Sequence, residues 1–282
     1  MLLRLISRLP LPALYALFGL IAWILRVVGW RRDLVDDGLG RCLPEKSPAE
    51  RADIAHEFYV DVGRLAAEVM HGSRMSADEL DQRLRFENDA VVHDALAEGR
   101  RVLLVAGHHF NWEWLLLAVS RRFAEPLVVP YKRISVASAD SWARATRSRF
   151  GATMVAAKDI GPYLVARRRQ VKLIAMLADQ SPARTNESQA WLPFFGHDTA
   201  FFQGPGWIGE RLRFEPVFIA MRSDGTGRYV ARFVPLGAPG ERMEAQQILR
   251  AYIAALEQAI RAHPAGYFWA YNRWKGPRIV DE

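Results

Sequence analysis

Two ionisable side chains, His108 and Glu113, follow an apolar run of strand length within the stretch VLLVAGHHFNWEWLLL (102–117). The run ends at Gly107, and a second apolar run of helical length follows Glu113. This order predicts a buried strand, a tight turn and the start of a helix. Because ligands of open α/β sheets bind at the carboxyl ends of strands, we expect this turn to carry the chemistry.

The residue types in this turn suit acid–base catalysis. With His108 at the strand end and Glu113 in the first helical turn, the carboxylate can accept a hydrogen bond from one imidazole nitrogen and fix its tautomer. The other nitrogen is then free to take a proton from a substrate hydroxyl, which is worth about 10²–10⁴-fold in rate. Amide groups near Asn111 or a nearby arginine are candidate donors to an oxyanion. The alternative for an isolated His-x4-Glu pair is two polar residues on a solvated turn.

Further candidate residues follow other predicted elements. Asp179 ends a second predicted strand and is a candidate site residue, with an Asx turn or a helix cap as the alternative. Lys132 follows a third predicted strand, and Arg149 ends a predicted helix; both can hold phosphates, against the alternative of a solvated face. Gly204 opens a predicted helix and can let a substrate approach the backbone. The aromatic run 191–196 is a candidate wall of an alkyl groove, with core packing as the alternative.

Composition narrows the class of protein. The 282 residues, half of them apolar, are enough for one large domain or two modest ones. A net charge of +7 and a pI near 9.8 favour an anionic partner such as acidic lipid or an acidic carrier protein. We expect no nucleic-acid partner, since no motif for one occurs, and no metal, since the remaining histidines lack a typical spacing. A single cysteine, Cys42, excludes an intrachain disulfide and fits a cytoplasmic catalytic domain.

The first thirty residues combine apolar and basic side chains. Residues 11–25 carry no charge, and arginines flank them on both sides. Fifteen residues are fewer than the about 20 that span a bilayer core. Two membrane interpretations stay open, a marginal span and a helix lying in the interface, beside the alternative of a buried core helix. Both membrane interpretations leave the body of the protein on the cytoplasmic side.

After Gly99, strand-like runs alternate with helical runs, which predicts an α/β fold with a mixed sheet flanked by helices. We expect residues 1–32 to form a membrane-associated helix and residues 33–282 to form a single domain. The expected strands are 102–106, 126–130, 153–156, 172–178, 216–222 and 228–235. The expected helices are 48–70, 77–83, 90–98, 112–122, 139–149, 161–169, 204–213 and 243–263.

Taken in order, these pieces resemble the bacterial lipid A late acyltransferases, the lauroyl/myristoyl acyltransferase family. The resemblance covers nearly the whole chain and includes the apolar, basic N-terminal helix and the helix after Glu45. Its motifs are Leu43-Pro44-Glu45, His108-x4-Glu113 with Asn111 and Trp112, Arg149-Phe150-Gly151, Asp179-Gln180, Pro193-Phe194-Phe195-Gly196, Gly204-Pro205 and Trp269-x3-Arg273-Trp274-Lys275.

The resemblance implies a fold related to the glycerol-phosphate acyltransferases and transfer of a fatty acyl group to a lipid hydroxyl. The donor would be acyl carrier protein or coenzyme A, and the acceptor an anionic lipid such as a lipid A precursor. His108 would be the base with Glu113 as its partner, and His109 is a candidate second base. Asp179 matches an acidic position that supports the histidine in related mannoside acyltransferases. Arg149 matches an arginine near a substrate phosphate.

The implied reaction needs no metal and no bound cofactor, and the enzyme would work at the cytoplasmic face of the cell inner membrane. Two alternatives stay beside lipid A acylation. The same chemistry can act on a glycerophospholipid, an aminolipid or a glycolipid. A lipid-binding protein of this fold, in which His108 and Glu113 are structural, is the non-catalytic alternative, and thioester hydrolysis by water is a related one.

Overall fold

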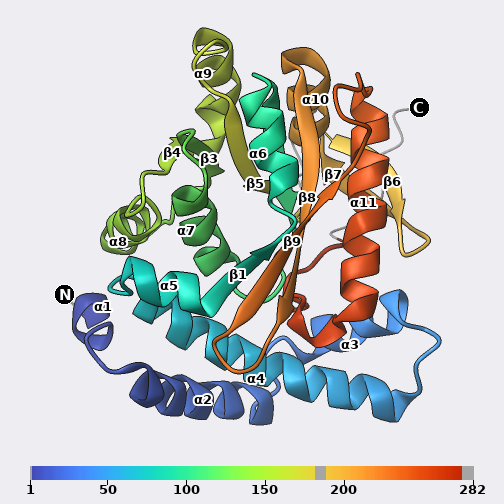
Figure 1. The fold of residues 1–282 in the computed structure, drawn as a ribbon. Coiled ribbons are helices and arrows are strands. Elements are labelled where there is room, and N and C mark those ends of the chain that lie inside the picture. The colour runs from blue at the N-terminus through green and yellow to red at the C-terminus, as the bar shows by residue number, and fades with distance from the viewer. Residues whose placement is uncertain (1, 182–188, 275–282) are drawn as a thin grey trace.

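The computed structural model describes residues 2–181 and 189–274, and within these residues the framework is a mixed sheet of seven strands (Figure 1). All neighbouring strands pair in parallel except β8 and β9, which are antiparallel. The predicted mixed α/β fold is therefore confirmed. The order across the sheet is β1 (Leu84–Glu87), β9 (Tyr229–Pro235), β8 (Phe214–Ser223), β2 (Arg101–Ala106), β5 (Leu173–Leu177), β3 (Leu127–Tyr131) and β4 (Thr153–Ala156).

The central strand β2 is a continuous apolar run in the sequence because both of its faces are buried. Val102, Leu103, Leu104 and Val105 are all buried, because helices cover both faces of a mainly parallel sheet. Alternate residues point to opposite faces: Leu103 and Val105 join one apolar core, and Val102 and Leu104 join another. The first core contains α9 (Ile160–Ala166), α10 (Gly204–Leu212) and α11 (Ala245–Ala262); the second contains α6 (Ala90–Ala97) and α7 (Trp112–Arg122).

Three short strands were not expected from the sequence. β1 lies at the edge of the sheet, and β6 (Gln189–Phe194) pairs with β7 (His197–Phe202) in a separate antiparallel hairpin. Phe195 and Gly196 form the two-residue turn of the hairpin. Both have a positive φ, as the type I′ turns that suit the twist of paired strands require. Phe194 and Phe195 are buried in the first core, so for these two rings of the run 191–196 the alternative of core packing applies rather than the alkyl groove.

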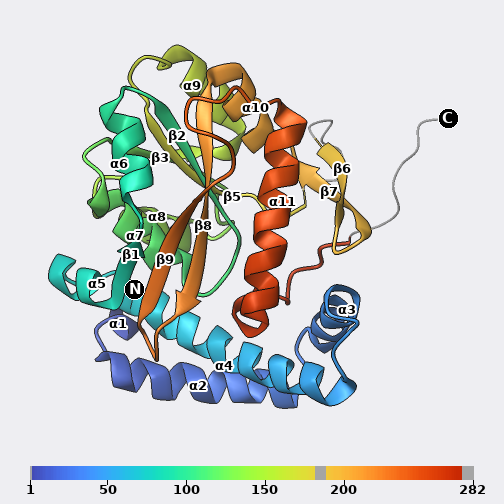
Figure 2. The same ribbon diagram turned by 45° about the vertical axis from the view of Figure 1, so that its right-hand side comes forward.

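The N-terminal helices form a layer beneath the sheet (Figures 1 and 2). Helix α4 (Pro48–Gly72) begins with a capping box of Ser47 and Glu50, and α2 (Leu11–Val27) runs along it. A Cβ on Gly63 of α4 would lie 2.9 Å from the Cβ of Ala22, so the two helices are in close contact. The helices of this layer are α1 (Leu2–Ile6), α2 (Leu11–Val27), α3 (Arg32–Cys42), α4 (Pro48–Gly72) and α5 (Ala77–Arg83); α8 (Ala137–Arg147) and the 3₁₀ turns Ala157–Asp159 and Pro264–Gly266 complete the helical elements described.

The outer side of α2 carries exposed apolar side chains, including Leu20, Trp23 and Val27. Its inner side buries Leu11 and Leu14. Among the helices that the structure describes, none by itself has both the length and the apolar character to cross a bilayer. By length and composition alone, α2 and α3 qualify only together, as a pair bent by 82°.

Candidate active site

The turn after β2 is held in a strained but well-supported conformation. A Cβ on Gly107 would come within 2.6 Å of the Leu256 side chain on α11, so a larger residue where the strand ends would have to displace that side chain. Phe110 adopts a left-handed conformation (φ 51°), and its N–H donates to the carbonyl of Gly266 over 2.7 Å. Such a conformation costs a bulky residue about 1–3 kcal/mol, so the contacts around the turn must hold it in place. They fix the direction in which His108 leaves the strand.

The partner of His108 is Asp179, which follows the neighbouring strand β5. The His108 Nδ1–H donates to Asp179 Oδ1 over 2.7 Å, and the backbone N–H of His108 donates to Asp179 Oδ2 over 3.0 Å. Burial acts to raise the pKa of Asp179, but the charge of His108 and these two hydrogen bonds lower it below its usual range. The carboxylate is therefore ionised, and it holds the proton of the imidazole on Nδ1.

The second ring nitrogen of His108 is left as an acceptor. The side-chain amide of Gln180 donates to His108 Nε2 over 3.3 Å. Trp112 stands against the imidazole at 4.9 Å between ring centres, with the planes inclined by 72°. Sequence reasoning did not select Gln180 as a site residue; the available signal was its position directly after Asp179. The imidazole of His108 is thus oriented by the Asp179 carboxylate at Nδ1 and by the Gln180 amide at Nε2, where a substrate hydroxyl can replace the amide.

The prediction that Glu113 contacts His108 is wrong. Glu113 instead forms a two-pronged ion pair with Arg147 of α8, with N–O distances of 2.5 and 2.8 Å. The physical reason is that Asp179 already occupies the protonated nitrogen of His108, while the planar guanidinium matches both carboxylate oxygens of Glu113. The hydrogen bonds with Glu113 raise the pKa of Arg147 further.

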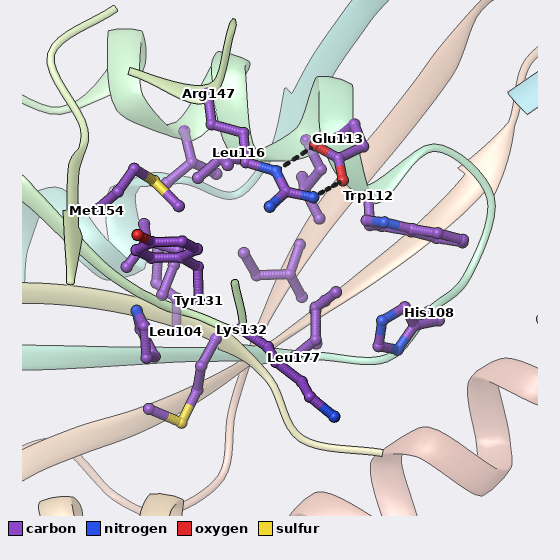
Figure 3. Close-up of a pocket in the computed structure, with 18 of the residues that line it drawn as sticks. Leu104, His108, Trp112, Glu113, Leu116, Tyr131, Lys132, Arg147, Met154 and Leu177 are labelled. Atoms are coloured by element: carbon purple, nitrogen blue, oxygen red, sulfur yellow. Dashed lines mark hydrogen bonds and ion pairs between the residues drawn. The ribbon is translucent and has the colours of Figure 1, made fainter. Parts of the chain in front are cut away.

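Glu113 and Arg147 nevertheless line the same cavity as His108 (Figure 3). The cavity has a volume of about 290 Å³ and extends along the inner face of α7 to strands β2, β3 and β5. Its polar lining consists mainly of His108, Glu113, Lys132, Arg147 and Gln180. Its apolar lining includes Leu104, Leu115, Leu116, Val119, Val129, Met154, Ala175, Met176, Leu177 and Ile219. The arrangement places a base at the side of a pocket that suits hydrocarbon.

Asn111 and His109, two expected supporting residues, are buried outside this cavity. Asn111 caps α7: its Oδ1 accepts from the N–H of Trp114 over 2.8 Å, and its Nδ2 donates to Glu68 over 2.6 Å. His109 donates from Nε2 to the carbonyl of His263 over 2.7 Å, and burial lowers its pKa to about 4. Neither side chain lines the cavity, so both act in this structure on the shape of the turn.

The two remaining expected substrate-binding residues also lie away from the cavity, whereas Lys132 lines it. Arg149 donates to the backbone carbonyls of Gly72 and Met75 over 2.6 and 3.0 Å, which ties the end of α8 to the end of α4. Gly204 begins α10 beside Phe202, whose ring leaves no room for a Cβ. Arg147 thus takes the place at the cavity that the sequence suggested for Arg149.

A fully buried carboxylate beneath the turn was missed altogether. Glu68 of α4 accepts hydrogen bonds from Tyr15, Asn111 and Tyr229 over 2.8, 2.6 and 2.7 Å. Burial raises the pKa of Glu68, and these three donors partly offset the shift. No local pattern marked Glu68, because its partners stand 43 to 161 positions away along the chain.

A comparison with known families identifies the class of protein. A family model described as bacterial lipid A biosynthesis acyltransferase matches residues 1–276. The chain belongs to this family. A search of curated proteins found no match. Membership makes the chain an acyltransferase of lipid A biosynthesis, as the resemblance predicted. Within residues 2–181 and 189–274, no group of three or more His, Cys, Asp or Glu side chains is placed to hold a metal ion.

Proposed function

We propose that this lipid A acyltransferase uses His108 as a general base to move a fatty acyl group from a thioester onto a hydroxyl of a lipid A precursor. The observation that supports it most strongly is the pairing of His108 with buried Asp179 beside an apolar cavity. The donor is an acyl carrier protein or coenzyme A thioester. Both carry a phosphopantetheine arm, and the reaction proceeds without a metal or bound cofactor.

The proton transfers follow from the orientation of the ring. The acceptor hydroxyl takes the position of the Gln180 amide and donates to His108 Nε2, which removes its proton as the oxygen attacks the thioester carbon. The resulting imidazolium is stabilised by the Asp179 carboxylate at Nδ1, which stays ionised throughout. His108 then returns the proton to the leaving thiolate, so the enzyme ends in its starting protonation state.

The developing oxyanion needs donors on the opposite side of the carbonyl. Glu113 engages the Nε and Nη2 groups of Arg147, which leaves its Nη1 group for a substrate. The Gln180 amide, once displaced from His108, is a second donor. Preorganised donors of this kind are worth about 10²–10³-fold each in rate. Lys132, which is exposed at the cavity, suits a phosphate of the donor arm.

Hydrocarbon and membrane contacts complete the proposal. The apolar part of the cavity, between α7 and the sheet, accommodates the acyl chain of the donor. The exposed apolar side chains of α2, with Arg26 at its end, fit a helix lying in the membrane interface. We place the enzyme at the cytoplasmic face of the cell inner membrane, with residues 1–32 in contact with lipid and 33–282 as one catalytic domain related to the glycerol-phosphate acyltransferases.

The test is a reconstituted transfer reaction. Purified protein is mixed with an acyl carrier protein or coenzyme A thioester and a lipid A precursor in vesicles, and the products are identified by mass spectrometry. We expect one added acyl chain with the wild-type chain and none with His108→Ala, while circular dichroism shows the variant folded. A folded His108→Ala protein that transfers at the wild-type rate would exclude His108 as the base.

A further inference from the structure

A second apolar cavity lies on the other side of the Glu113–Arg147 ion pair from the cavity that contains His108. Its volume is about 170 Å³, and it is enclosed by α1, α4, α7 and α8. Glu113 and Arg147 line this cavity as well as the one that contains His108. Neighbouring residues on α7 divide between the two, since Leu116 faces the first and Leu117 the second. The ion pair therefore forms part of the wall between two separate pockets.

The residues that line the second cavity indicate which class of ligand it can bind. Apart from the mutually neutralised Glu113 and Arg147, its lining carries no charged side chain among the residues described. The indole N–H of Trp114 is already bonded to the carbonyl of Glu68. What remains is mainly hydrocarbon and aromatic surface: Leu3, Val69, Leu117, Ile134, Ala139, Trp142 and Ala143. Thr146 is the other polar residue of the lining. The cavity thus offers a sugar or a phosphate few groups to replace its hydration, whereas a hydrocarbon chain needs none.

The position of the cavity connects it to the apolar N-terminal surface. Leu3 belongs to α1, and Trp142 of α8 packs on the small cluster around Leu14 of α2. Leu5 of α1 and Leu9, which precedes α2, also expose apolar side chains. The lining of the second cavity is thus in contact with the apolar cluster that includes Leu14 of α2, the helix that we place at the membrane.

We propose that the second cavity binds the end of a hydrocarbon chain of the lipid acceptor, with the Glu113–Arg147 pair separating it from the donor chain. The proposal rests on the proposed transfer reaction. That reaction forms no covalent enzyme intermediate, so donor and acceptor must be bound together, and each brings a hydrocarbon chain. An apolar cavity of about 150 Å³ is known to bind a ligand the size of benzene, so this one suits the end of a chain rather than its full length.

The kinetic test fills the cavity from its rim. Ala139 lines the cavity on α8 and is partly exposed, while Ala145 on the same helix is exposed and lines neither pocket. We expect Ala139→Phe to raise the KM for a lipid A precursor at least fivefold and to leave the KM for the thioester donor unchanged. Ala145→Phe should behave as wild type in both. Equal KM values for the acceptor in the two variants would overturn the proposal.

A cross-linking test locates the chain directly and does not depend on turnover. A lipid A precursor with a diazirine at the end of one acyl chain is photolysed on the wild-type protein and on His108→Ala, and labelled peptides are sequenced. We expect labels at Val69, Ile134 or Trp142 in both proteins. Labels at Met154 or Ile219, or on α2 alone, would overturn the second site. If His108→Ala retains transfer while the labels fall as expected, the proposed base fails and the second site stands.

Discussion

Replacing Asp179 by asparagine tests the central pair without changing its shape. In the wild-type chain both carboxylate oxygens accept, one from the ring and one from the backbone N–H of His108. An amide has one oxygen and one NH₂ group. If its oxygen faces the ring, the NH₂ opposes the backbone N–H. If its NH₂ faces the ring, Nδ1 becomes the acceptor and the ring proton moves to Nε2, where the substrate proton has to go.

The expected loss of rate follows from the role of the carboxylate in the proposed reaction. There it fixes the tautomer and stabilises the imidazolium at 2.7 Å, inside a site where the Asp179 side chain is only 3% exposed. Loss of a carboxylate with the same two duties in a serine-protease triad costs about 10⁴ in kcat. We expect Asp179→Asn to lower kcat by about 10²–10⁴-fold. At 1.36 kcal/mol for each factor of ten, the barrier rises by about 3–5 kcal/mol.

The assay compares initial transfer rates of Asp179→Asn and Glu113→Gln at pH 7.5 under saturating donor. Because the pKa of Asp179 is lowered in the folded state, its carboxylate stabilises the fold above the unfolded pKa of about 4, and this stabilisation is lost as the pH falls through the folded value. The asparagine variant is therefore less stable at neutral pH, and rates are taken on protein shown to be folded. A rate within threefold of wild type, beside a 100-fold loss in Glu113→Gln, would refute the assignment of Asp179 as partner.

Two further substitutions test residues that the structure places outside the cavity. Arg149→Ala removes two hydrogen bonds to backbone carbonyls and should lower the free energy of unfolding by about 1–3 kcal/mol in urea titration, with both KM values unchanged; a raised KM would instead indicate substrate contact. The pKa of His109 is about 4 in the fold and about 6.5 unfolded, so the unfolded chain binds the proton more readily, and stability falls as the pH drops from 6.5 to 4. The free energy of unfolding should therefore fall by about 3 kcal/mol between pH 6.5 and pH 4, and this fall should be absent in His109→Gln. An equal pH dependence of stability in both proteins would contradict a buried neutral imidazole at His109.

The sequence predicts well those helices and strands whose conformation is determined by a local pattern of residues. The buried parallel strands are near-continuous apolar runs, and α7 begins and ends where its cap residue and apolar pattern indicate. The strands that were missed lack such a signal. β1 has four residues, two of them charged, and β6 contains Pro193. Both gain their strand conformation from a partner rather than from their own composition.

The site shows the same limit at the level of side chains. His108 was found because the end of an apolar strand is visible in the sequence. Its partner was assigned to Glu113, the nearest acid along the chain. The true contact with Asp179 depends on the register of β2 against β5, in which Ala106 stands opposite Leu177. A single sequence does not state that register, so the residue pattern alone marks Asp179 as a candidate, and only the family resemblance indicates that it supports the histidine.

Arg147 and Arg149 illustrate a second physical reason. Successive residues of a helix are rotated by about 100°, so side chains two positions apart point in nearly opposite directions. The predicted helix 139–149 included both arginines and did not fix which side faced the strand ends. In the structure α8 ends at Arg147, which reaches Glu113, and Arg149 turns back to α4.

The buried side chain of Glu68 connects the turn after β2 to the N-terminal helix α2. One of its oxygens accepts from Tyr15 of α2, and the other accepts from Asn111, the residue that caps α7 three positions after His108. Removing the Tyr15 hydroxyl would leave the buried Oε1 without its donor at a cost of about 1–3 kcal/mol, whereas Oε2 also accepts from Tyr229. These hydrogen bonds hold the turn and the helix in one arrangement. The distance between His108 and the outer face of α2 is therefore set within the protein. If the outer face of α2 contacts the membrane as proposed, the lipids lie at a constant distance from His108.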